Sequence, residues 1–396
     1  MNALSVARTL WRRGVAVDVL AGSISDSPVQ HSRAARSYVQ LTEGQDPTDA
    51  WLDWLRTSAQ PSVVLPCSDE GLELIARHRH SLTAVGHQPI EANDEVLLAM
   101  LDKSRTYELA RQIGVPAPQT ITVAVTDDLD LLDRFTFPCA IKPVNSHVFV
   151  RRFQPFAKGA RVHSPQHARR LLEPIMAEGI AMLLTEVVDG TDECCSYYSY
   201  LDAEGEPLTH FTKRKLRVYP THFGLGTYHM TEWQPEVAEL GLRFFQGVGL
   251  RGVGNVEFKR DRRDGQLKLI ECNPRFTHAN ELVRFSGIDF GWLAYSRLAG
   301  TPPPPLDGFR DNIGFWFAVD DVRALRQYRR DGELSLASWT SSMFHRQCPP
   351  TFWWRDPRPS LRNGSLRAAA LGRRLNHRRA GRTVAPAADL DPYDPA

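Results

Sequence analysis

Cysteine is scarce in this sequence, with six residues among 396, and the only close pair is Cys194 and Cys195. No C-x-x-C pair or zinc-binding spacing occurs, which excludes a zinc module of the usual kind and favours reduced thiols over a disulfide framework. Long apolar runs are missing too, because none approaches the roughly 18 residues of a membrane-spanning helix. Residues 1–14 lack the apolar segment of a signal peptide. We therefore expect a cytoplasmic protein with no membrane partner.

The sequence also has no large excess of charge of one sign. The net charge is +2, so no overall field marks nucleic acid as a partner. Arginines do crowd residues 355–382, where a solvated helix face and tail is favoured over contact with a polyanion or a membrane surface. The composition, 42% hydrophobic and 24% charged, is typical of a globular chain of about two to three domains.

The first 91 residues alternate between helix and strand patterns. Helical spacing and short apolar runs predict, in chain order, a helix over 4–11, a strand over 15–20, a helix over 48–55, a strand over 62–66 and a helix over 68–78 capped by Ser68. This alternation predicts an open parallel sheet. Such a sheet usually starts with a strand, whereas this chain starts with a helix. Either one upstream strand is missing from the sequence or the fold begins with a helix.

From about residue 92 the pattern becomes α+β. A helix predicted over 93–113 carries Lys103, and a strand predicted over 137–144 carries Lys142. The elements that follow are a helix over 164–179, a strand over 181–190, a hairpin around Glu204 and Gly205, a helix over 234–249 and a hairpin over 254–274. Beyond residue 305 the chain is rich in Trp and Phe, and residues 379–396 have too little apolar surface to fold.

The hairpin over 254–274 carries the strongest chemical signal. Strand alternation places two groups of residues each on a single face: Asn255, Glu257 and Lys259 on the first strand, and Leu267, Leu269, Glu271 and Asn273 on the second. A three-residue loop over 263–265, with Gly265 left-handed, pairs Glu257 with Glu271. A two-residue loop over 264–265 would pair Glu257 with Cys272 and separate the carboxylates. We predict the three-residue loop.

Two opposed carboxylates on a sheet repel each other and therefore call for a cation. Asn273 adds a neutral oxygen on the same face, and such hard ligands suit magnesium that bridges nucleotide phosphates. The plain alternative is an exposed hairpin with solvated acids. Because Pro274 and Arg275 follow at once, we favour the metal site and predict that Glu257, Glu271 and Asn273 bind magnesium.

Several segments together resemble one superfamily. GNVEFKRDRRDGQLKLIECNPRF (254–276) resembles the metal-binding hairpin of the ATP-grasp superfamily, to which biotin carboxylase, carbamoyl-phosphate synthetase and D-alanine–D-alanine ligase belong. AIKPV (140–144) resembles its lysine strand, LLTEVVDG (183–190) its adenine-binding hinge, and ALSVARTLWRRGVAVDVL (3–20) its preceding nucleotide-like domain. KRKLRVYPTHFGLGTY (213–228) is similar to the GRKLRQYP-type segment of a branch with D-aspartate ligase-like enzymes.

The resemblance implies a fold class of α/β and α+β. A Rossmann-like pre-ATP-grasp domain, its first strand missing from the sequence, would occupy 1–91, and the ATP-grasp domain would occupy 92–305. The latter would divide into subdomains over 92–187 and 188–305. A small C-terminal extension over 306–378 and a disordered tail over 379–396 would follow.

The resemblance also implies a role for each candidate residue: Lys103 and Lys142 on the α- and β-phosphates, Glu186 and Val188 beside the adenine, Glu193 or else Asp192 on the ribose, Lys215 on the γ-phosphate, Arg275 on the transferring phosphoryl group or the substrate carboxylate, and Glu257, Glu271 and Asn273 on one or two magnesium (or manganese) ions. The lysines suit these roles because ammonium groups are good partners for phosphate. One departure concerns the phosphate cover. Residues 145–159 hold a single glycine where many members have a Gly-rich loop, so Ser146, His147 or Arg151 would cover the phosphates.

The implied activity is that of an ATP-dependent carboxylate–amine ligase. ATP would convert a carboxylate into an acyl phosphate, and an amine would then displace phosphate. Two alternatives stay open, a phosphotransferase without ligation and a nucleotide-binding protein without catalysis. The expected partners are a small acid and a small amine, with a homodimer as a further expectation. His278, Asn280, Glu281 and Arg284 would line the second-substrate pocket or simply begin a helix.

Overall fold

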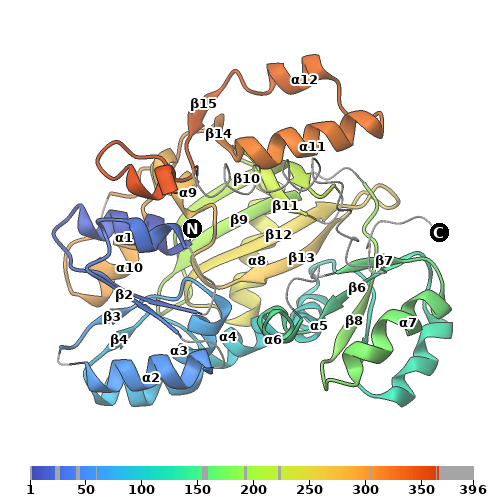
Figure 1. Cartoon of the computed structure of the whole chain (residues 1–396), viewed down its shortest axis with the longest axis horizontal. Helices are drawn as coiled ribbons and strands as arrows, with labels where there is room; N and C mark the ends of the chain where they lie inside the picture. Colours follow the sequence, from blue (N-terminus) through green and yellow to red (C-terminus); the bar gives the residue numbers. More distant parts are fainter. Residues whose placement is uncertain are drawn as a thin grey trace, which may run out of the picture.

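The structure is a computed structural model that describes residues 2–22, 27–41, 45–58, 60–153, 159–190, 194–221, 224–303, 305–362 and 364. These residues form a seven-stranded sheet, a four-stranded sheet and two pairs of parallel strands. Figure 1 shows the seven-stranded sheet between the N-terminal strand pairs and the four-stranded sheet. The tail expected over 379–396 lies outside the described residues.

The N-terminal part combines helices with two separate parallel strand pairs. Its elements are α1 (Asn2–Trp11), β1 (Asp18–Ala21), the 3-10 helix η1 (Pro28–His31), β2 (Ser37–Gln40), α2 (Pro47–Thr57), β3 (Val63–Val64), α3 (Asp69–Ala84) and β4 (Gln88–Pro89). β1 pairs with β2 and β3 with β4, both in parallel. The two predicted strands are β1 and β3, which lie in separate pairs instead of one open sheet, and the pattern predicts neither β2 nor β4. The Ser68 hydroxyl accepts a hydrogen bond from the Gly71 amide (3.1 Å) and caps α3, as predicted.

The second part of the chain forms the antiparallel four-stranded sheet in the order β5-β8-β6-β7. Its elements are α4 (Asp94–Leu101), α5 (Lys103–Ile113), β5 (Thr120–Val123), the 3-10 helix η2 (Thr126–Arg134), β6 (Cys139–Pro143), α6 (Ser146–Arg152), β7 (Ala160–Val162), α7 (Pro165–Met176) and β8 (Met182–Glu186). The prediction of one helix over 93–113 is wrong. Asp102 is extended and its carboxylate caps α5 through the Arg105 amide (3.0 Å), because aspartate favours a helix start over a helix interior.

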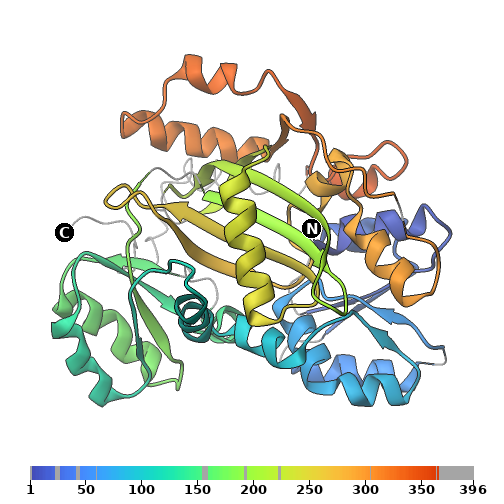
Figure 2. The same ribbon diagram turned by 180° about the vertical axis from the view of Figure 1, so that it is seen from behind.

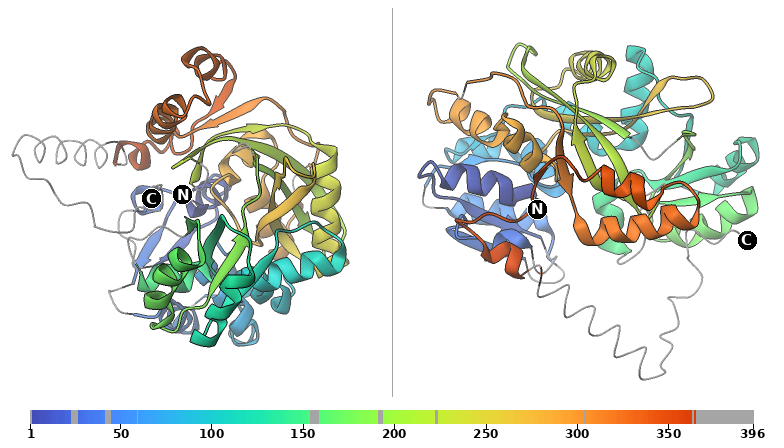
Figure 3. Two further views of the ribbon diagram at one scale, coloured as in Figure 1. Left: turned by 90° about the vertical axis from the view of Figure 1, so that its right-hand side faces the viewer. Right: turned by 90° about the horizontal axis from the view of Figure 1, so that it is seen from above.

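The seven-stranded sheet has the order β13-β12-β9-β10-β11-β14-β15. Its strands and the helices among them are β9 (Cys194–Leu201), β10 (Pro207–Tyr219), β11 (Leu225–Thr231), α8 (Pro235–Val248), β12 (Gly252–Arg260), β13 (Leu267–Asn273), α9 (Asn280–Ser286), α10 (Phe290–Leu298), β14 (Ile313–Trp316), α11 (Ala318–Arg330), α12 (Leu336–Ser341) and β15 (Arg346–Cys348). β14 and β15 complete the sheet beyond β11, so the aromatic C-terminal residues are part of it. Figure 3 shows α11 and α12 beside this end of the sheet.

The two faces of the seven-stranded sheet pack differently. Figure 2 shows α8 lying across one face, where Phe244 and Phe245 join Val256 and Phe258 of β12 in one apolar cluster. Near the N-terminal part, another cluster joins residues of α1, α2 and α3 with α9, α10 and strands of the sheet. The N-terminal part is therefore fixed to the sheet by buried apolar contacts.

Candidate active site

The turn between β12 and β13 differs from the prediction. The Asp261 amide donates to the Gln266 carbonyl (2.9 Å), which leaves a four-residue loop over 262–265 instead of the expected three-residue loop. Such a loop alone would align Glu257 with Ile270. A β-bulge between Glu257 and Phe258 leaves Ile270 unpaired and restores the predicted pairing of Glu257 with Glu271. The pairing is confirmed, although the loop that was to produce it is wrong.

The bulge has a clear physical cause. Leu267 and Leu269, 2% and 0% exposed, belong to the apolar cluster under α8, together with Cys272. The prediction that both leucines share a face with Glu271 is therefore wrong. Positions 267 and 271 differ by an even number, so an unbroken strand cannot bury one and turn the other to the opposite face. Burying each leucine is worth about 1.5–3 kcal/mol, which favours the register that needs the bulge.

On the face away from α8, four residues of neighbouring strands form one row. Lys213 of β10 pairs with Ser196 of β9, Ser196 pairs with Glu257, and Glu257 pairs with Glu271. Directly paired residues on adjacent strands point to the same side of a sheet. The two carboxylates therefore lie side by side, with a lysine at the other end of the row.

The charge of Glu257 is balanced by lysine. The Lys215 ammonium donates to its carboxylate at 2.9 Å. Burial would raise the pKa of Glu257, but Lys215 and Lys213 outweigh it and lower that pKa. For Lys215 burial is likewise outweighed, and the carboxylate raises its pKa. Glu271, by contrast, accepts no hydrogen bond from the part of the chain that the structure describes, so one carboxylate of the pair is open to a ligand.

The donor set fits magnesium bound together with phosphate. Glu257, Glu271 and Asn273 offer two carboxylates and one amide oxygen on one face. No group of three or more His, Cys, Asp or Glu side chains suited to a metal occurs among the described residues. A site with few protein ligands is what magnesium uses when phosphate oxygens and water complete its shell.

Two further lysines come from the second part of the chain, one on strand β6 and one at the start of helix α5. Lys142 of β6 has its pKa lowered by burial, with Glu271 opposing the effect, so the ammonium lies close enough to the β12–β13 hairpin to interact with the charge of Glu271. It makes no hydrogen bond or ion pair within the described chain. Lys103 opens α5, where its amide donates to the Val144 carbonyl (3.2 Å) and its ammonium to the Ser146 hydroxyl (2.7 Å). Lys142 therefore lies near the hairpin, and Lys103 lies near Asp69 of α3, whose pKa its charge helps to lower.

Arg275 joins the hairpin to the N-terminal part. Its Nε donates to Asp69 at 2.5 Å and its Nη2 to the Asn273 amide oxygen at 2.8 Å. Burial would lower the arginine pKa, but Asp69 raises it. An amide oxygen has two lone pairs, so Asn273 retains one for a metal. Nothing in the sequence marks Asp69 as a partner of Arg275. An acid in the first turn of a helix is common, and that alone would account for Asp69 at the start of α3.

The hinge predicted between the two sheets is tied to the hairpin. Glu186, the last residue of β8, accepts from Arg263 (2.5 Å) in the hairpin loop and from the Gln119 amide (3.1 Å), and Val188 beyond it is buried. The predicted ribose ligands, Glu193 or Asp192, lie outside the described residues. The structure thus brings together Lys142, Lys215, Glu257, Glu271, Asn273 and Arg275, with Lys103 beside them.

Comparison with known proteins points to one group of enzymes. No family model matches the chain. It is 24% identical over 237 residues to D-aspartate ligase of Enterococcus faecium, covering 57% of this chain and 56% of the relative. It is 24% identical over 217 residues to D-alanine–D-alanine ligase of Chromohalobacter salexigens, covering 51% and 65%. The chain thus spans less than two thirds of the length of these relatives.

Solved structures decide the fold. An L-amino acid ligase from Bacillus licheniformis superposes with a TM-score of 0.59 at 18% identity, over 76% of this chain and 73% of that one. Biotin carboxylase from Campylobacter jejuni superposes with a TM-score of 0.59 at 15% identity, over 79% and 72%. The chain has the ATP-grasp fold. Among the described residues, no helix has the length and apolar character to span a membrane.

In this ATP-grasp fold, the segment that stands where many members have a Gly-rich loop begins with helix α6. His147 of α6 hydrogen-bonds Glu73 of α3 (3.0 Å), and Arg151 pairs with Asp46, the N-cap of α2 (3.0 Å). Of the three side chains predicted to cover the phosphates, only Ser146 lies against a candidate phosphate lysine, Lys103. The other two fasten α6 to the N-terminal part.

Replacing Glu73 by glutamine is expected to weaken this attachment in a pH-dependent way. His147, together with Arg77, lowers the pKa of Glu73 to about 2. The stabilisation is fully present above the unfolded-state pKa near 4.5 and is lost as the pH falls toward 2. We expect a loss of about 1–2 kcal/mol at pH 7 that shrinks at pH 3.5, measured by urea unfolding. Glu239→Gln, on the exposed side of α8, is the control, and an equal loss at both pH values would contradict the attachment.

Lys213 is a buried residue of the candidate site that the sequence patterns did not single out. It is 1% exposed, and its ammonium contacts the Ser196 hydroxyl (2.9 Å) and His229 Nδ1 (3.3 Å). Burial lowers its pKa to about 8. A signal was available, since the sequence has only seven lysines and Lys213 alternates with Lys215, so that both point to one face of β10.

Replacing Lys213 by methionine is expected to stabilise the protein at pH 7. Methionine removes a buried charge, a gain of about 1–3 kcal/mol. The native pKa lies near 8 and the unfolded value near 10.5. Between about pH 8 and pH 10.5 the unfolded wild-type chain binds more protons than the folded one. Wild-type stability therefore rises with pH in this range, and the stability advantage of the variant shrinks. Urea unfolding of both proteins at pH 7 and at pH 9.5 measures the gain in stability and its decrease with pH. A variant less stable than wild type at pH 7 would show that the fold needs the charge.

The residues after Arg275 fasten α9 to α1. Asn280 donates to the Ser5 hydroxyl (3.2 Å), and Ser5 donates to Glu281 (2.8 Å), which also pairs with Arg284. Their side chains are thus engaged with one another. The structural alternative left open for Asn280, Glu281 and Arg284 explains these contacts without a substrate.

Proposed function

We propose that this chain is an ATP-dependent carboxylate–amine ligase. It would convert a carboxylate into an acyl phosphate and then form an amide, releasing ADP and phosphate. The observation that carries this proposal is the opposed pair Glu257 and Glu271, on the same sheet face as Lys213, with Lys142 of the other sheet close enough to interact with the charge of Glu271. Phosphoryl transfer depends on charge neutralisation and alignment more than on covalent chemistry. This arrangement of acids and lysines is suited to both.

The metal-binding face would work together with Lys215. Glu257, Glu271 and Asn273 would hold one or two magnesium ions, or manganese. Bound magnesium neutralises phosphate charge and aligns the oxygens for transfer. Because Lys215 pairs with Glu257, a cation on that carboxylate would free the ammonium for the γ-phosphate. Lys142 and Lys103 would contact the α- and β-phosphates.

The remaining proposed contacts orient the two ends of the substrates. Glu186 and Val188 would flank the adenine, and Glu193 or Asp192 would bind the ribose. Arg275 would hold the substrate carboxylate or the transferring phosphoryl group. A guanidinium forks onto planar carboxylates, and Asp69 fixes its direction through Nε. Asp69 would therefore be a positioning residue.

We further infer the domain organisation given by the resemblance. A Rossmann-like domain over 1–91 would precede the ATP-grasp domain over 92–305, with subdomains over 92–187 and 188–305 and an extension over 306–378. The parallel pairs β1–β2 and β3–β4, with helices between their strands, support an α/β organisation of residues 1–91. An enzyme that consumes ATP and acts on small acids and amines is expected in the cytoplasm.

The test is ADP release by the full chain with ATP, magnesium and pooled amino acids and dipeptides, followed by mass spectrometry of the products. D-amino acids belong in the pool because relatives are named for D-aspartate and D-alanine. A condensed product that requires ATP and an amine, and is lost in Glu271→Ala, supports a ligase. A phosphorylated substrate without an amine would indicate a phosphotransferase. Nucleotide binding without turnover across the pool would overturn the proposal.

A further inference from the structure

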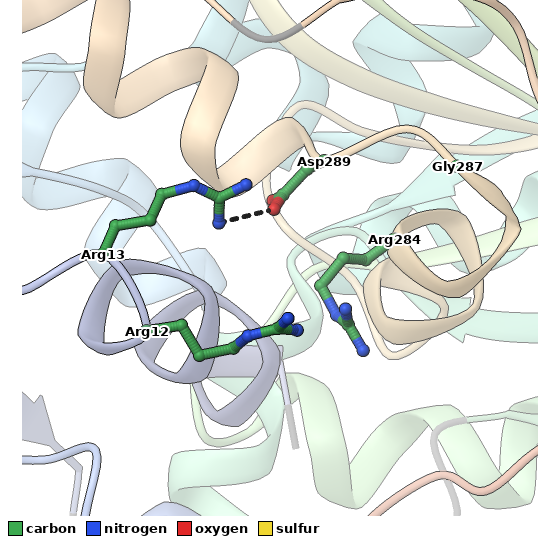
Figure 4. Close-up of a pocket in the computed structure, with 5 residues that line it drawn as sticks. All are labelled: Arg12, Arg13, Arg284, Gly287 and Asp289. Atoms are coloured by element: carbon green, nitrogen blue, oxygen red, sulfur yellow. Dashed lines mark ion pairs between the residues drawn. The ribbon is translucent and has the colours of Figure 1, made fainter.

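Three arginine side chains converge on a surface cavity at the C-terminal end of α1. The cavity has a volume of about 420 Å³ and is lined by Arg12, Arg13, Arg284, Gly287 and Asp289. Figure 4 shows the guanidinium groups of Arg12 and Arg284 pointing toward each other, while Arg13 turns to Asp289. Like charges brought together repel, so the arrangement favours an anion between them.

The nearby acids are already engaged. Asp289 caps α10 through the Trp292 amide (3.1 Å), accepts the Thr9 hydroxyl and pairs with Arg13 (3.1 Å). Glu281 binds Arg284 through both of its oxygens (3.0 and 2.6 Å). These two carboxylates therefore offset two of the three arginines.

Arg12 is the least compensated of the three arginines. Within the described chain it forms no ion pair with an acid. Partial burial, and then the charges of Arg284 and Arg13, lower its pKa; the charge of Asp289 opposes them, and Arg355 adds to the lowering. The cavity thus carries an excess of positive charge.

This cavity lies apart from the candidate active site. At the other end of α1, the side-chain amide of Asn2 donates to the Cys67 carbonyl (2.9 Å). Cys67 lies two residues before Asp69, which holds Arg275. Ten residues of helix separate Asn2 from Arg12, which is roughly 15 Å at the rise of an α-helix. An anion at Arg12 would therefore be a ligand separate from the nucleotide.

An aromatic cavity adjoins the cationic one and shares Arg284 with it. It also has a volume of about 420 Å³, and its walls include Phe285, Phe352, Trp353 and Trp354. The Arg12 guanidinium lies 5.4 Å from the ring centroid of Trp353, between the two spaces. A ligand that fills both would join an anionic group to an apolar or aromatic body.

We propose that these adjoining cavities bind a small phosphate monoester with an aromatic or apolar body. The phosphate would lie among Arg12, Arg13 and Arg284, and the body would pack on Trp353. A phosphate monoester carries nearly two negative charges and three acceptor oxygens, which suits several guanidinium groups better than a carboxylate does. The proposal requires no ATP chemistry, so it stands or falls independently of the ligase function.

The test is isothermal titration calorimetry of the full chain with phenyl phosphate at low ionic strength. AMP-PNP and magnesium are present throughout, to fill the candidate nucleotide site. We expect saturable binding that weakens about tenfold or more in Arg12→Gln, since a charged hydrogen bond is lost. Arg243→Gln on α8 is the matched control and is expected to bind like wild type. Phenol, which lacks the phosphate, is expected not to bind.

Three results would overturn the proposal. Wild-type protein that does not bind phenyl phosphate is one, and equal affinity in wild type and Arg12→Gln is another. The third is a subunit contact in place of a ligand site. It would show as a dimer in light scattering that Arg12→Gln dissociates, with no heat from phenyl phosphate. Arg12 is exposed, so the variant is expected to fold, and its thermal melting temperature checks this.

Discussion

Glu271→Gln is expected to reduce ATP turnover by at least ~1,000-fold, equivalent to about 4 kcal/mol of transition-state stabilisation. Glu271 is the carboxylate of the opposed pair that accepts no hydrogen bond from the described residues, whereas Glu257 already has Lys215. Glutamine keeps the shape but removes the charge that would hold a divalent cation. The measurement is steady-state ADP release with saturating ATP and magnesium.

Stability separates this loss of activity from unfolding. Removing one of two opposed like charges is expected to leave the melting temperature unchanged or to raise it. Glu239→Gln, on a side chain that is 71% exposed, changes the same residue type away from the site and is expected to keep full turnover. ADP release within tenfold of wild type in Glu271→Gln would contradict the metal role. So would a matching fall in Glu239→Gln.

Asp321→Ala is expected to destabilise the protein by about 3–5 kcal/mol, the effect of breaking a buried ion pair from one side. The Asp321 carboxylate is 0% exposed and accepts five hydrogen bonds of 2.7–3.1 Å: two from Arg217, and one each from Thr227, Trp316 and Trp339. Arg217 of β10 is only 4% exposed. Without Asp321 it would stay charged and buried with no carboxylate to pair with. Urea unfolding at pH 7 gives the difference in the free energy of unfolding.

The neighbouring Asp320→Ala is the control, since Asp320 lies on the surface and pairs with Arg323. Its effect is expected to stay within about 0.5 kcal/mol. The double variant Arg217→Met with Asp321→Leu is expected to lose less than Asp321→Ala, because no unpaired charge remains buried. A loss below about 1 kcal/mol in Asp321→Ala would refute the view that this carboxylate anchors α11 to the sheet.

The β12–β13 hairpin shows what a sequence can and cannot specify here. Side-chain alternation correctly predicts that Glu257 and Glu271 oppose each other. It fails for the loop and for Leu267 and Leu269, because a bulge changes the face of every residue beyond it. The sequence itself contains the conflict, because Leu267 and Leu269 alternate in step with Glu271 and Asn273. A regular strand would place the apolar and the metal-binding side chains on the same face. A strand that turns such residues to opposite faces, one to the core and one to the site, needs a β-bulge between them.

The pairing of distant residues is the part that sequence could not supply. Lys142, Lys215 and Arg275 stand in recognisable segments, but Asp69 meets Arg275 across 206 positions of chain, and Asp321 meets Arg217 across 104. No local spacing encodes such contacts, because they depend on how whole sheets and helices dock. Lys213 is different, since its position two residues before Lys215 was enough to place it on the same face.

The position of Arg217 limits how this chain could be recombined with its relatives. β10 carries Lys213 and Lys215 in its middle and Arg217 near its end, while the acid that neutralises Arg217 belongs to α11. A crossover placed between residues 231 and 313 would separate the two unless both parents had the same pair. Functional chimaeras are therefore expected to inherit β10, β11 and the C-terminal segment from one parent.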